Sequence, residues 1–385
     1  MKPLRILSIF GTRPEAVKMA PVVQALQSNP AIESKVCVTA QHREMLDQVL
    51  DLFAIQPDHD LNLMRPDQAL AGLTAEIFNH LDPVLTQEQP DWVLVQGDTT
   101  TVMAASLAAF YRGIRVGHVE AGLRTGDKRQ PFPEEINRRV TSVVADLHFA
   151  PTEFSRANLL REGIPAWRIE VTGNTVIDAL QQIVETEAPQ KVTRWLRKWG
   201  IGKSGKKLIL VTAHRRENFG TPIRQICEAI KTLAQDYGER LYFVYPVHLN
   251  PNIQQPVHDL LGGLPGVSLI EPVDYLTLVH LMKNAHLVLT DSGGIQEEAS
   301  GLGKPTLVLR EVTERPEGVQ AGVLKLVGSD PDVIVRETRR LLEDPAAYNE
   351  MSRASGVFGD GRAAGRIVQA LLDFAEPSAA RSNGS

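Results

Sequence analysis

Short apolar runs alternate with longer amphipathic runs along almost the whole chain, which has 385 residues. The short runs have the length of buried strands, and the longer runs have the spacing of helices with one apolar face. Regular alternation of this kind is typical of βαβ units, whose parallel strands form a sheet with helices on both faces. The pattern therefore predicts an α/β fold built from doubly wound parallel sheets.

Two successive series of elements are predicted, and a chain of this length is expected to form two domains of roughly 150 to 200 residues. The first series has strands at Leu4–Phe10, Lys35–Thr39, Trp92–Gln96, Arg115–Val119, Leu147–Ala150 and Arg168–Val171. Its helices lie near Pro14–Gln27, Glu44–Phe53, Leu70–Leu85, Thr101–Tyr111, Glu134–Ala145, Glu153–Glu162 and Val176–Glu185. The second series has strands at Leu208–Thr212, Leu241–Tyr245, Val267–Ile270, Leu287–Thr290, Thr306–Leu309 and Leu324–Val327. The last predicted helices lie near Pro331–Leu342, Ala346–Ala354 and Ala363–Phe374.

The alternation breaks after Glu185, and we interpret the following segment as the hinge region between the domains. It contains a basic helix around Trp195 and Trp199 and the loop Gly200–Gly205. The loop matches G-x-G-x-x-G by letter, but it precedes a strand instead of following one, so we interpret it as linker. The two domains are expected to face each other across a central cleft, with ligands beyond the carboxyl ends of the strands.

Charge and cysteine content restrict the environment in which the chain works. A net charge of −5 and a pI near 6.1 argue against a general nucleic-acid or membrane surface. No apolar stretch approaches the roughly 18 to 20 residues that cross a bilayer. Cys37 and Cys227 are too few for a disulfide framework. A reduced, cytoplasmic setting is therefore expected.

A glycine-rich turn follows the predicted strand Leu287–Thr290 and precedes a helix, which is the order expected of an anion site. Gly293 and Gly294 would let a diphosphate approach the backbone, where the first N–H groups of the helix are unpaired donors. Glu298 lies one turn further and is predicted to bind ribose hydroxyls. The alternative is a simple capping turn with Ser292 as N-cap. The neighbouring Glu297 is expected to be solvated.

A second strand–turn–helix junction lies at Gly11–Glu15, and we interpret it as another anion-facing turn. Arg13 and Lys18 flank it at the end of a predicted strand, which favours anion contact over an ordinary surface position. Arg315 stands after another predicted strand and is a similar candidate. Two such turns in two domains predict one ligand that is held between them.

His214 ends the apolar run that precedes Arg215 and Arg216. A histidine at the tip of a buried strand, next to two arginines, is placed to donate to phosphate oxygens. The alternative is a histidine that only caps the local backbone. A metal site is not expected, because the H-E-x-x-H pattern does not occur and the arginines would repel a cation.

Carboxylates follow two neighbouring predicted strands and begin one helix of the first domain. Asp98 and Glu120 come after strands, while Glu134 shares a helix face with Arg138. Carboxylates that lie close together shift one another's pKa and can hold different protonation states, which acid/base chemistry at carbon requires. The alternative is that some of them form structural ion pairs with Arg124 or Arg138.

Taken together, these motifs resemble the non-hydrolysing UDP-N-acetylglucosamine 2-epimerases from about residue 4 to residue 374. Each string by itself is modest, but their number and order are specific. The strings are Gly11–Lys18, Gln96–Thr100, Gly117–Arg124, Pro133–Glu135, Asn137–Arg138, Gly173–Asn174, His214–Glu217, Tyr245–His248, Asp291–Gly294 and Thr313–Pro316.

The resemblance implies a GT-B-type fold of two Rossmann-like domains. It places residues 1–172 with 361–376 in the first domain and 173–360 in the second, and leaves 377–385 as a frayed tail. It also implies a homodimer without NAD or another cofactor, which interconverts UDP-GlcNAc and UDP-ManNAc for bacterial surface polysaccharide.

Site residues carry over from the resemblance in three groups. The UDP group is Arg13, His214, Ser292, Gly293, Gly294, Glu298 and Arg315, with Leu278 where some members place an aromatic side chain near uracil. The sugar group is Lys18, Asp98, Glu120, Glu134 and Arg138. A second UDP-GlcNAc, acting as an activator, is associated with Gln41, His42 and His248.

Three other functions stay open at this point. A hydrolysing 2-epimerase would release free ManNAc, and a GT-B glycosyltransferase would need an acceptor. A non-catalytic UDP-sugar sensor would exchange no hydrogen with solvent. The carboxylate group favours the epimerase over a glycosyltransferase, which needs one base.

Overall fold

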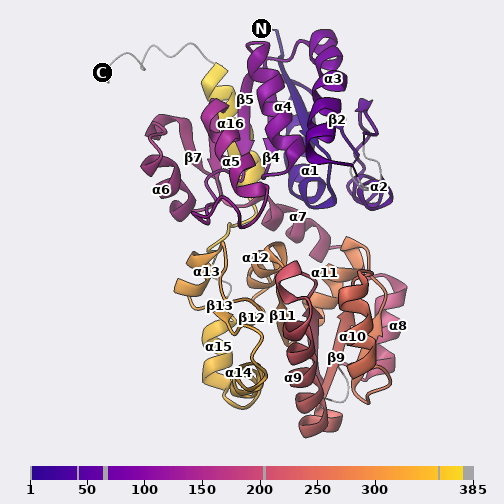
Figure 1. Cartoon of the computed structure of the whole chain (residues 1–385). Helices are drawn as coiled ribbons and strands as arrows, with labels where there is room; N and C mark the ends of the chain where they lie inside the picture. Colours follow the sequence, from indigo (N-terminus) through magenta and orange to yellow (C-terminus); the bar gives the residue numbers. More distant parts are fainter. Residues whose placement is uncertain (1, 41–42, 64–67, 203–204, 354–355, 376–385) are drawn as a thin grey trace. The chain divides into compact units, whose positions relative to one another are not determined.

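The computed structural model describes residues 2–40, 43–63, 68–202, 205–353 and 356–375 (Figure 1). It divides into two compact units, Met1–Ala179 with Gly359–Ser385 (unit 1) and Leu180–Phe358 (unit 2). Each unit holds one parallel sheet, so the predicted α/β class with two parallel-sheet domains is confirmed. None of the described helices is long and apolar enough to cross a membrane.

Unit 1 contains, within the described residues, a seven-stranded parallel sheet with the order β3-β2-β1-β4-β5-β6-β7. The strands are β1 (Leu4–Phe10), β2 (Ile32–Val38), β3 (His59–Asp60), β4 (Trp92–Gln96), β5 (Arg115–Val119), β6 (Leu147–Ala150) and β7 (Ile169–Val171). The helices are α1 (Arg13–Gln27), α2 (Arg43–Leu52), α3 (Leu70–Glu88), α4 (Thr100–Tyr111), α5 (Glu134–Val144), α6 (Glu153–Arg161), α7 (Thr175–Val184), which runs on into unit 2, and α16 (Ala363–Ala375).

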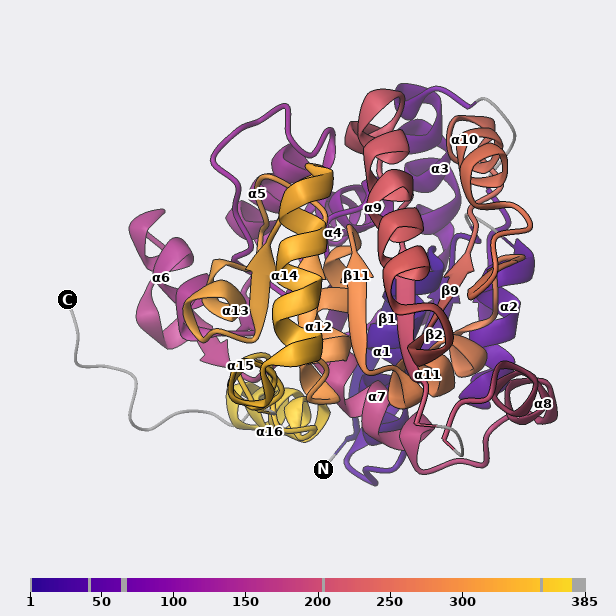
Figure 2. The same cartoon turned by 90° about the horizontal axis from the view of Figure 1, so that it is seen from below.

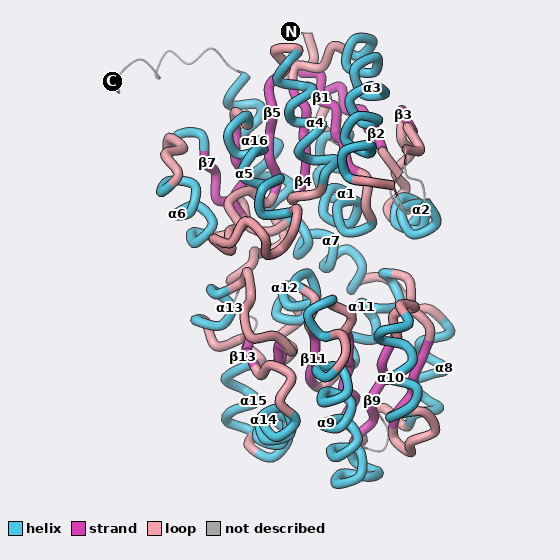
Figure 3. Tube along the Cα trace, in the orientation of Figure 1, coloured by secondary structure: helices cyan, strands magenta, loops and turns pink. Residues whose placement is uncertain are grey.

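Unit 2 contains, within its described part, a six-stranded parallel sheet with the order β10-β9-β8-β11-β12-β13. The strands are β8 (Lys207–Thr212), β9 (Leu241–Pro246), β10 (Val267–Ile270), β11 (Leu287–Thr290), β12 (Thr306–Val308) and β13 (Leu324–Leu326). The helices are α8 (Gln190–Trp199), α9 (Thr221–Tyr237), α10 (Pro251–Leu261), α11 (Tyr275–Asn284), α12 (Gly293–Gly301), α13 (Pro316–Gln320), α14 (Pro331–Glu343) and α15 (Pro345–Met351). Figure 3 shows the strands in magenta among the cyan helices.

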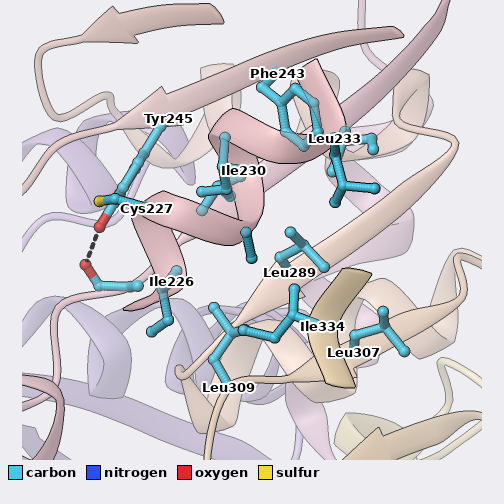
Figure 4. Packing of buried hydrophobic residues seen from close by; sticks show 14 of the residues in the cluster. Ile226, Cys227, Ile230, Leu233, Phe243, Tyr245, Leu289, Leu307, Leu309 and Ile334 are labelled. Atoms are coloured by element: carbon cyan, nitrogen blue, oxygen red, sulfur yellow. Dashed lines mark hydrogen bonds between the residues drawn. The ribbon is translucent and has the colours of Figure 1, made fainter. Parts of the chain in front are cut away.

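The core of unit 2 follows the two-residue alternation of its central strand. Ile209 and Val211 belong to the apolar cluster under α9, α10 and α14, and α9 and α14 run beside each other (Figure 2). Leu208 and Leu210 point to the other face and pack with α8, α11 and α12. Figure 4 shows the first cluster, in which the Tyr245 hydroxyl donates to the Ala213 carbonyl at 2.6 Å. This bond holds the chain where β8 ends and the candidate site begins.

The hinge interpretation of the segment after Glu185 was wrong. Its basic helix is α8, and Val192 and Trp199 are buried in the cluster that covers one face of the unit 2 sheet. Trp199 also stacks on Tyr242, with 5.4 Å between ring centroids. The helix therefore belongs to unit 2, and its basic residues lie on the face that points away from the core.

The C-terminal helix α16 belongs to unit 1, where Figure 1 shows it in yellow among the elements of that unit. It packs against α1, and Phe374 meets the buried Trp92 edge-on with 5.2 Å between ring centroids. Asp178 of α7 accepts hydrogen bonds from the backbone N–H groups of Ala363 and Ala364 at 3.2 and 2.9 Å. This carboxylate fixes the first turn of α16, because helix N-termini have N–H groups without intrahelical partners.

Both sheets have the strand order of a doubly wound fold, in which the direction of winding changes beside the first strand. In unit 1 this point lies between β1 and β4, and in unit 2 between β8 and β11. Ligands of such sheets bind beyond the carboxyl ends of the strands at the change in direction. The candidate residues follow these strands: Arg13 after β1, Asp98 after β4, His214 after β8 and Ser292 after β11.

Two buried histidines face each other across β5 and β6, where His118 pairs in register with His148. Burial lowers the pKa of His118 to about 4 and that of His148 to about 3, the latter with help from the neighbouring His118. Both side chains are therefore neutral in the fold, while the unfolded chain takes up protons below about pH 6.5.

Stability is expected to fall as the pH drops below 6.5, since each of these histidines opposes folding once the unfolded chain is protonated. For His148 the loss is about 1.4 kcal/mol per pH unit between pH 6.5 and 4. The variant His148→Leu should remove the contribution of His148 to the pH dependence of the unfolding free energy. The contribution of His118 should remain. Urea unfolding at a series of pH values measures both slopes, and identical slopes would contradict the assignment.

Candidate functional site

The turn after β1 is built around the buried carboxylate of Glu15. Its Oε2 accepts from the backbone N–H groups of Gly11 and Thr12 at 3.0 and 2.6 Å, and its Oε1 accepts from the Thr99 hydroxyl at 2.6 Å. Burial raises the pKa of Glu15, and these hydrogen bonds oppose that shift. The carboxylate of the chain itself therefore takes two backbone N–H groups of the turn that was interpreted as anion-facing.

Glu120 is a buried carboxylate of unit 1 that is held by three donors. Its residue is 8% exposed, and its carboxylate accepts from Lys18, from Gln96 and, at 3.1 Å, from the amide of Asn174. Its backbone has a φ of 64°, in the left-handed region that is unfavourable for a glutamate. Residues held in such conformations cluster at functional sites, where the surrounding structure compensates for the strain.

Asp98 lies at the end of the neighbouring strand β4 and pairs with the buried Arg138 of α5 at 2.5 Å. Arg138 also binds Glu135 at 3.3 Å, and Asn137 donates to the Asp98 carbonyl at 2.9 Å. Glu134, the first residue of α5, is half-buried. The start of α5 therefore holds Asp98 through both its side chain and its backbone.

The alternative of structural ion pairs holds for Asp98, which is paired with Arg138. Arg124 pairs with Glu162 at 2.7 Å.

Asp291 organises the site in unit 2, and sequence reasoning gave it no role. It is fully buried, and its Oδ2 accepts from the backbone N–H groups of His214 and Arg215, both at 2.8 Å. The Asn218 side chain donates to the same oxygen at 2.9 Å. The other oxygen lies 3.6 Å from Nδ1 of His214. This carboxylate therefore holds the loop after β8, and its second oxygen lies beside the His214 ring.

The turn before α12 is open at Gly294. Ser292 stands at the N-cap, but among the described residues its side chain makes no capping hydrogen bond, which does not fit the simple capping alternative. A methyl group on Gly294 would meet no atom within 4 Å, whereas one on Gly293 would lie 2.8 Å from Nη1 of Arg315. A side chain at position 293 would therefore displace the guanidinium of Arg315. Gly294 faces open space at a helix N-terminus, where anions bind.

Arg315 is 8% exposed and is held by carboxylates of its own unit. Its Nε donates to Glu297 at 2.9 Å, and Nη1 lies 3.5 Å from Glu314. Burial raises the pKa of Glu314, but Arg315 and Arg310 more than offset this and lower it to about 2. The expectation of a solvated Glu297 was wrong: it is 1% exposed and fixes Arg315 beside the glycine turn.

The remaining candidates have different surroundings. Glu298 is buried on α12 at 5% exposure. Leu278 lies on α11 with 7% of its surface exposed, inside the apolar cluster of unit 2. His248 is exposed and stacks on His214, with 5.5 Å between ring centroids and 11° between ring planes. Gln41 and His42 lie outside the described residues.

Sequence reasoning gave no role to several residues that position the candidates. Gln96 and Asn174 bind Glu120, and Glu135 binds Arg138 and the backbone of Thr125. Gln96 and Asn174 each end or follow a strand, as Asp98 and Glu120 do, so this shared position was the available signal. Glu135 carried no such signal, because only packing shows which face of α5 is buried.

Charged side chains gather at the carboxyl ends of both sheets, and the two units are α/β domains with a GT-B-like fold. A family model described as UDP-N-acetylglucosamine 2-epimerase matches residues 24–372. A UDP-N-acetylglucosamine 2-epimerase of Salmonella typhimurium is 55% identical over 375 residues, which cover 96% of this chain and 99% of that protein.

Solved structures agree with the sequence comparison. The crystal structure of UDP-GlcNAc 2-epimerase from Neisseria meningitidis bound to UDP-GlcNAc is 52% identical and covers 96% of this chain and 100% of that one, with a TM-score of 0.91. The enzyme from Methanocaldococcus jannaschii in complex with UDP-GlcNAc and UDP is 34% identical, with the same coverage and a TM-score of 0.82. The chain belongs to the UDP-N-acetylglucosamine 2-epimerase family and is an enzyme of the isomerase type.

Proposed function

We propose that the protein interconverts UDP-GlcNAc and UDP-ManNAc by eliminating UDP and adding it back. In the elimination, the C2 proton passes to a carboxylate and the C1–oxygen bond breaks, so that UDP leaves with the electron pair. A C1–C2 double bond forms and gives 2-acetamidoglucal. In the return step, C2 takes a proton on the other face and a UDP oxygen bonds to C1, so the net reaction is an isomerisation.

The elimination needs a base that takes the C2 proton and positive groups that stabilise the departing UDP. A sugar C2 proton is not acidic, so its removal requires that the negative charge on departing UDP is stabilised at the same time. Electrostatic stabilisation of this kind is often the largest single contribution to catalysis, and a positioned acid or base adds about 10²- to 10⁴-fold. The two kinds of group in this chain fit these two tasks.

The observation that carries the proposal is the constrained Glu120, held at the same sheet edge as the Asp98–Arg138 pair. We assign proton transfer to Asp98, Glu120 and Glu134, with Lys18 and Arg138 near the sugar. We assign UDP to Arg13, His214, Ser292, Gly293, Gly294, Glu298, Leu278 and Arg315. His214, next to Asp291, acts on the leaving diphosphate.

The decisive experiment is incubation with UDP-GlcNAc in D₂O, followed by NMR. The proposal expects deuterium at C2 of both UDP-GlcNAc and UDP-ManNAc, with no free sugar. Free ManNAc together with UDP would indicate a hydrolysing epimerase. Retention of hydrogen at C2 would overturn the proposal and leave a UDP-sugar sensor or an acceptor-dependent glycosyltransferase.

The UDP assignment predicts opposite effects of Gly294→Ala on stability and on binding. Alanine is the better helix former by up to about 1 kcal/mol, and the added methyl group meets no protein atom, so the free protein should not be destabilised. The same methyl group would occupy the space that the diphosphate needs, and we expect UDP affinity to fall at least about tenfold. Thermal unfolding and calorimetric titration with UDP test the two parts.

Gly293→Ala is the matched variant, and it should destabilise the free protein because its methyl group meets Arg315. If Gly294→Ala binds UDP as tightly as the unaltered protein, the assignment of the diphosphate to this turn fails.

We further propose that the protein is a homodimer, formed through apolar side chains of unit 1. Phe110 and Tyr111 at the end of α4 are 56% and 72% exposed, and Val143 of the contacting helix α5 is 81% exposed. Tyr111 stacks on Phe78 of α3, with 6.1 Å between ring centroids, so the surface extends over three helices. Clusters of exposed apolar side chains of this kind mark interaction surfaces.

Val143→Glu is expected to shift the protein from dimer to monomer without unfolding it, because the side chain has few contacts within its own unit. Sedimentation velocity measures the change. Leu249→Glu, an exposed apolar residue of unit 2 at 64%, is the control and should leave the dimer intact. A Val143→Glu protein that stays dimeric would place the interface elsewhere.

We also propose that a second UDP-GlcNAc activates the enzyme at a site that includes His248. Gln41 and His42, which the resemblance also associates with the activator, lie outside the described residues. The support is the stacking of His248 on His214, through which an occupied second site would act on the leaving group. His248→Ala should remove any sigmoidal dependence of rate on UDP-GlcNAc; an unchanged rate curve would count against the proposal.

The product is proposed to supply bacterial surface polysaccharide. Deleting the gene in its host should remove N-acetylmannosamine-derived residues from surface glycan, and an unchanged glycan composition would argue against this role.

A further inference from the structure

Asn174 occupies a position that connects the candidate base to the rest of unit 1. It is 2% exposed, and its side-chain amide donates to Oε1 of Glu120 at 3.1 Å. Its side-chain oxygen accepts from the backbone N–H of Val176 at 3.1 Å, in the first turn of α7. Both the nitrogen and the oxygen of the amide are therefore hydrogen-bonded, and these two bonds fix the orientation of the side chain.

The backbone of Asn174 is fixed from another direction by the segment through which the chain returns to unit 1. Unit 2 ends at Phe358, and Gly359 has a φ of 139°, which L-residues with side chains rarely adopt. A methyl group on Gly359 would lie 3.2 Å from the backbone nitrogen of Asn174 and 3.4 Å from Cα of Gly173. The backbone of Asn174 is therefore closely packed against the segment at Gly359.

We infer that Asn174 is a positioning residue for the reaction, which holds Oε1 of Glu120 in place. The inference rests on the proposed role of Glu120 in proton transfer. A carboxylate that takes a proton from carbon must be ionised and must point at its target, and hydrogen bonds to its oxygens favour the ionised form. Lys18 and Gln96 donate to the same carboxylate, but neither is held between a helix start and a second backbone as Asn174 is.

The charged groups around Glu120 determine the sign of the expected pH effect. Lys18 of α1 donates to the carboxylate and favours its charged form, and His118 of β5 is neutral because burial lowers its pKa to about 4. Asn174 adds a neutral donor to this set. Replacing the donor with a second negative charge raises the pKa of Glu120. The acidic limb of the kcat profile, which reports the charged base, must then move to higher pH.

The test compares Asn174→Asp and Asn174→Ser with the unaltered enzyme. Asn174→Asp keeps an oxygen for the Val176 N–H but places a carboxylate against Glu120; we expect kcat at pH 7 to fall at least about tenfold and the acidic limb to move up by about one pH unit or more. Asn174→Ser keeps an N-cap acceptor but cannot reach Glu120, so kcat should fall with a smaller pH change. KM should change less than about threefold in both, because Asn174 is not assigned to the substrate.

Asn158→Asp is the matched control, since Asn158 is another buried amide of unit 1, which donates to the Gly122 carbonyl at 2.8 Å. Asn158→Asp removes a buried amide donor just as Asn174→Asp does. It should therefore lower stability, but it should not shift the pH profile of kcat. An Asn174→Asp enzyme with an unaltered pH profile and kcat overturns the inference, and if that variant does not fold, Asn174→Ser with normal kcat does so. Failure of the unaltered enzyme to exchange the C2 hydrogen would instead overturn the proposed function itself.

Discussion

Glu120→Gln is expected to lower kcat for C2 epimerisation by about 10²- to 10⁴-fold, the share of a positioned acid or base. The glutamine amide cannot remove the C2 proton, and its NH₂ group would face donors from Lys18, Gln96 and Asn174. Asp98→Asn should also lower kcat strongly, because it removes the second carboxylate of the proposed proton transfers. Initial rates and loss of the C2 hydrogen in D₂O measure the effect.

Glu162→Gln provides the control for these variants. Glu162 also pairs with an arginine in unit 1, at 2.7 Å from Arg124, but it is not assigned to the reaction. We expect its kcat to stay within about twofold, because removing a partly exposed ion pair costs little stability. Near-normal turnover in both Glu120→Gln and Asp98→Asn would refute the assignment of proton transfer to these carboxylates.

Arg315→Met is expected to weaken UDP binding and to destabilise unit 2 at the same time. Hydrogen bonds to charged groups contribute about 1.5 to 3 kcal/mol, which corresponds to a loss of UDP affinity of about 10- to 100-fold. The substitution also leaves the buried Glu297 without its arginine, and breaking a buried ion pair costs about 3 to 5 kcal/mol.

The double variant Arg315→Met/Glu297→Met separates the two effects. Removing both partners of the pair should restore part of the stability, because no uncompensated charge stays buried at this point. UDP affinity should stay low, because the guanidinium is still missing. Urea unfolding and calorimetry measure the two quantities. A double variant that is no more stable than Arg315→Met would show that the pair does not account for the loss.

Strand positions were predicted correctly wherever the local pattern of apolar residues decides the structure. The strands Leu4–Phe10, Trp92–Gln96 and Leu287–Thr290 have the predicted bounds, because a run buried on both faces is apolar along its whole length. The two-residue strand β3 (His59–Asp60) was missed, because so short a pairing at the sheet edge leaves no periodic pattern. The hinge interpretation of α8 failed because the sequence of a basic, amphipathic helix does not show which sheet its apolar face packs against. In the structure that face, with Val192 and Trp199, is buried in unit 2.

Single residues of the candidate site also show what sequence can predict and what only packing decides. Glu297 and Glu298 are neighbours on α12, and sequence reasoning kept one for the ligand and left the other to solvent. Both are buried, because α12 is enclosed by its own sheet and by the loop that carries Arg315. The turn at Gly11–Glu15 looked like an anion site by composition, yet Glu15 folds back onto it. Side-chain rotamers decide which oxygen accepts from which N–H group, and the spacing of residues along the chain does not predict these rotamers.

The order of residues along this chain determined by itself that parallel sheets form, and which side chains stand at the ends of their strands. These features follow from periodicity, since a strand or helix needs only its own pattern of apolar residues to be recognised. Only the tertiary structure decided that Glu120 is clamped by three donors from distant segments and that Asp291 carries the His214 loop. Those contacts join residues from 24 to 102 positions apart, and the packing of whole elements brings them within hydrogen-bonding distance.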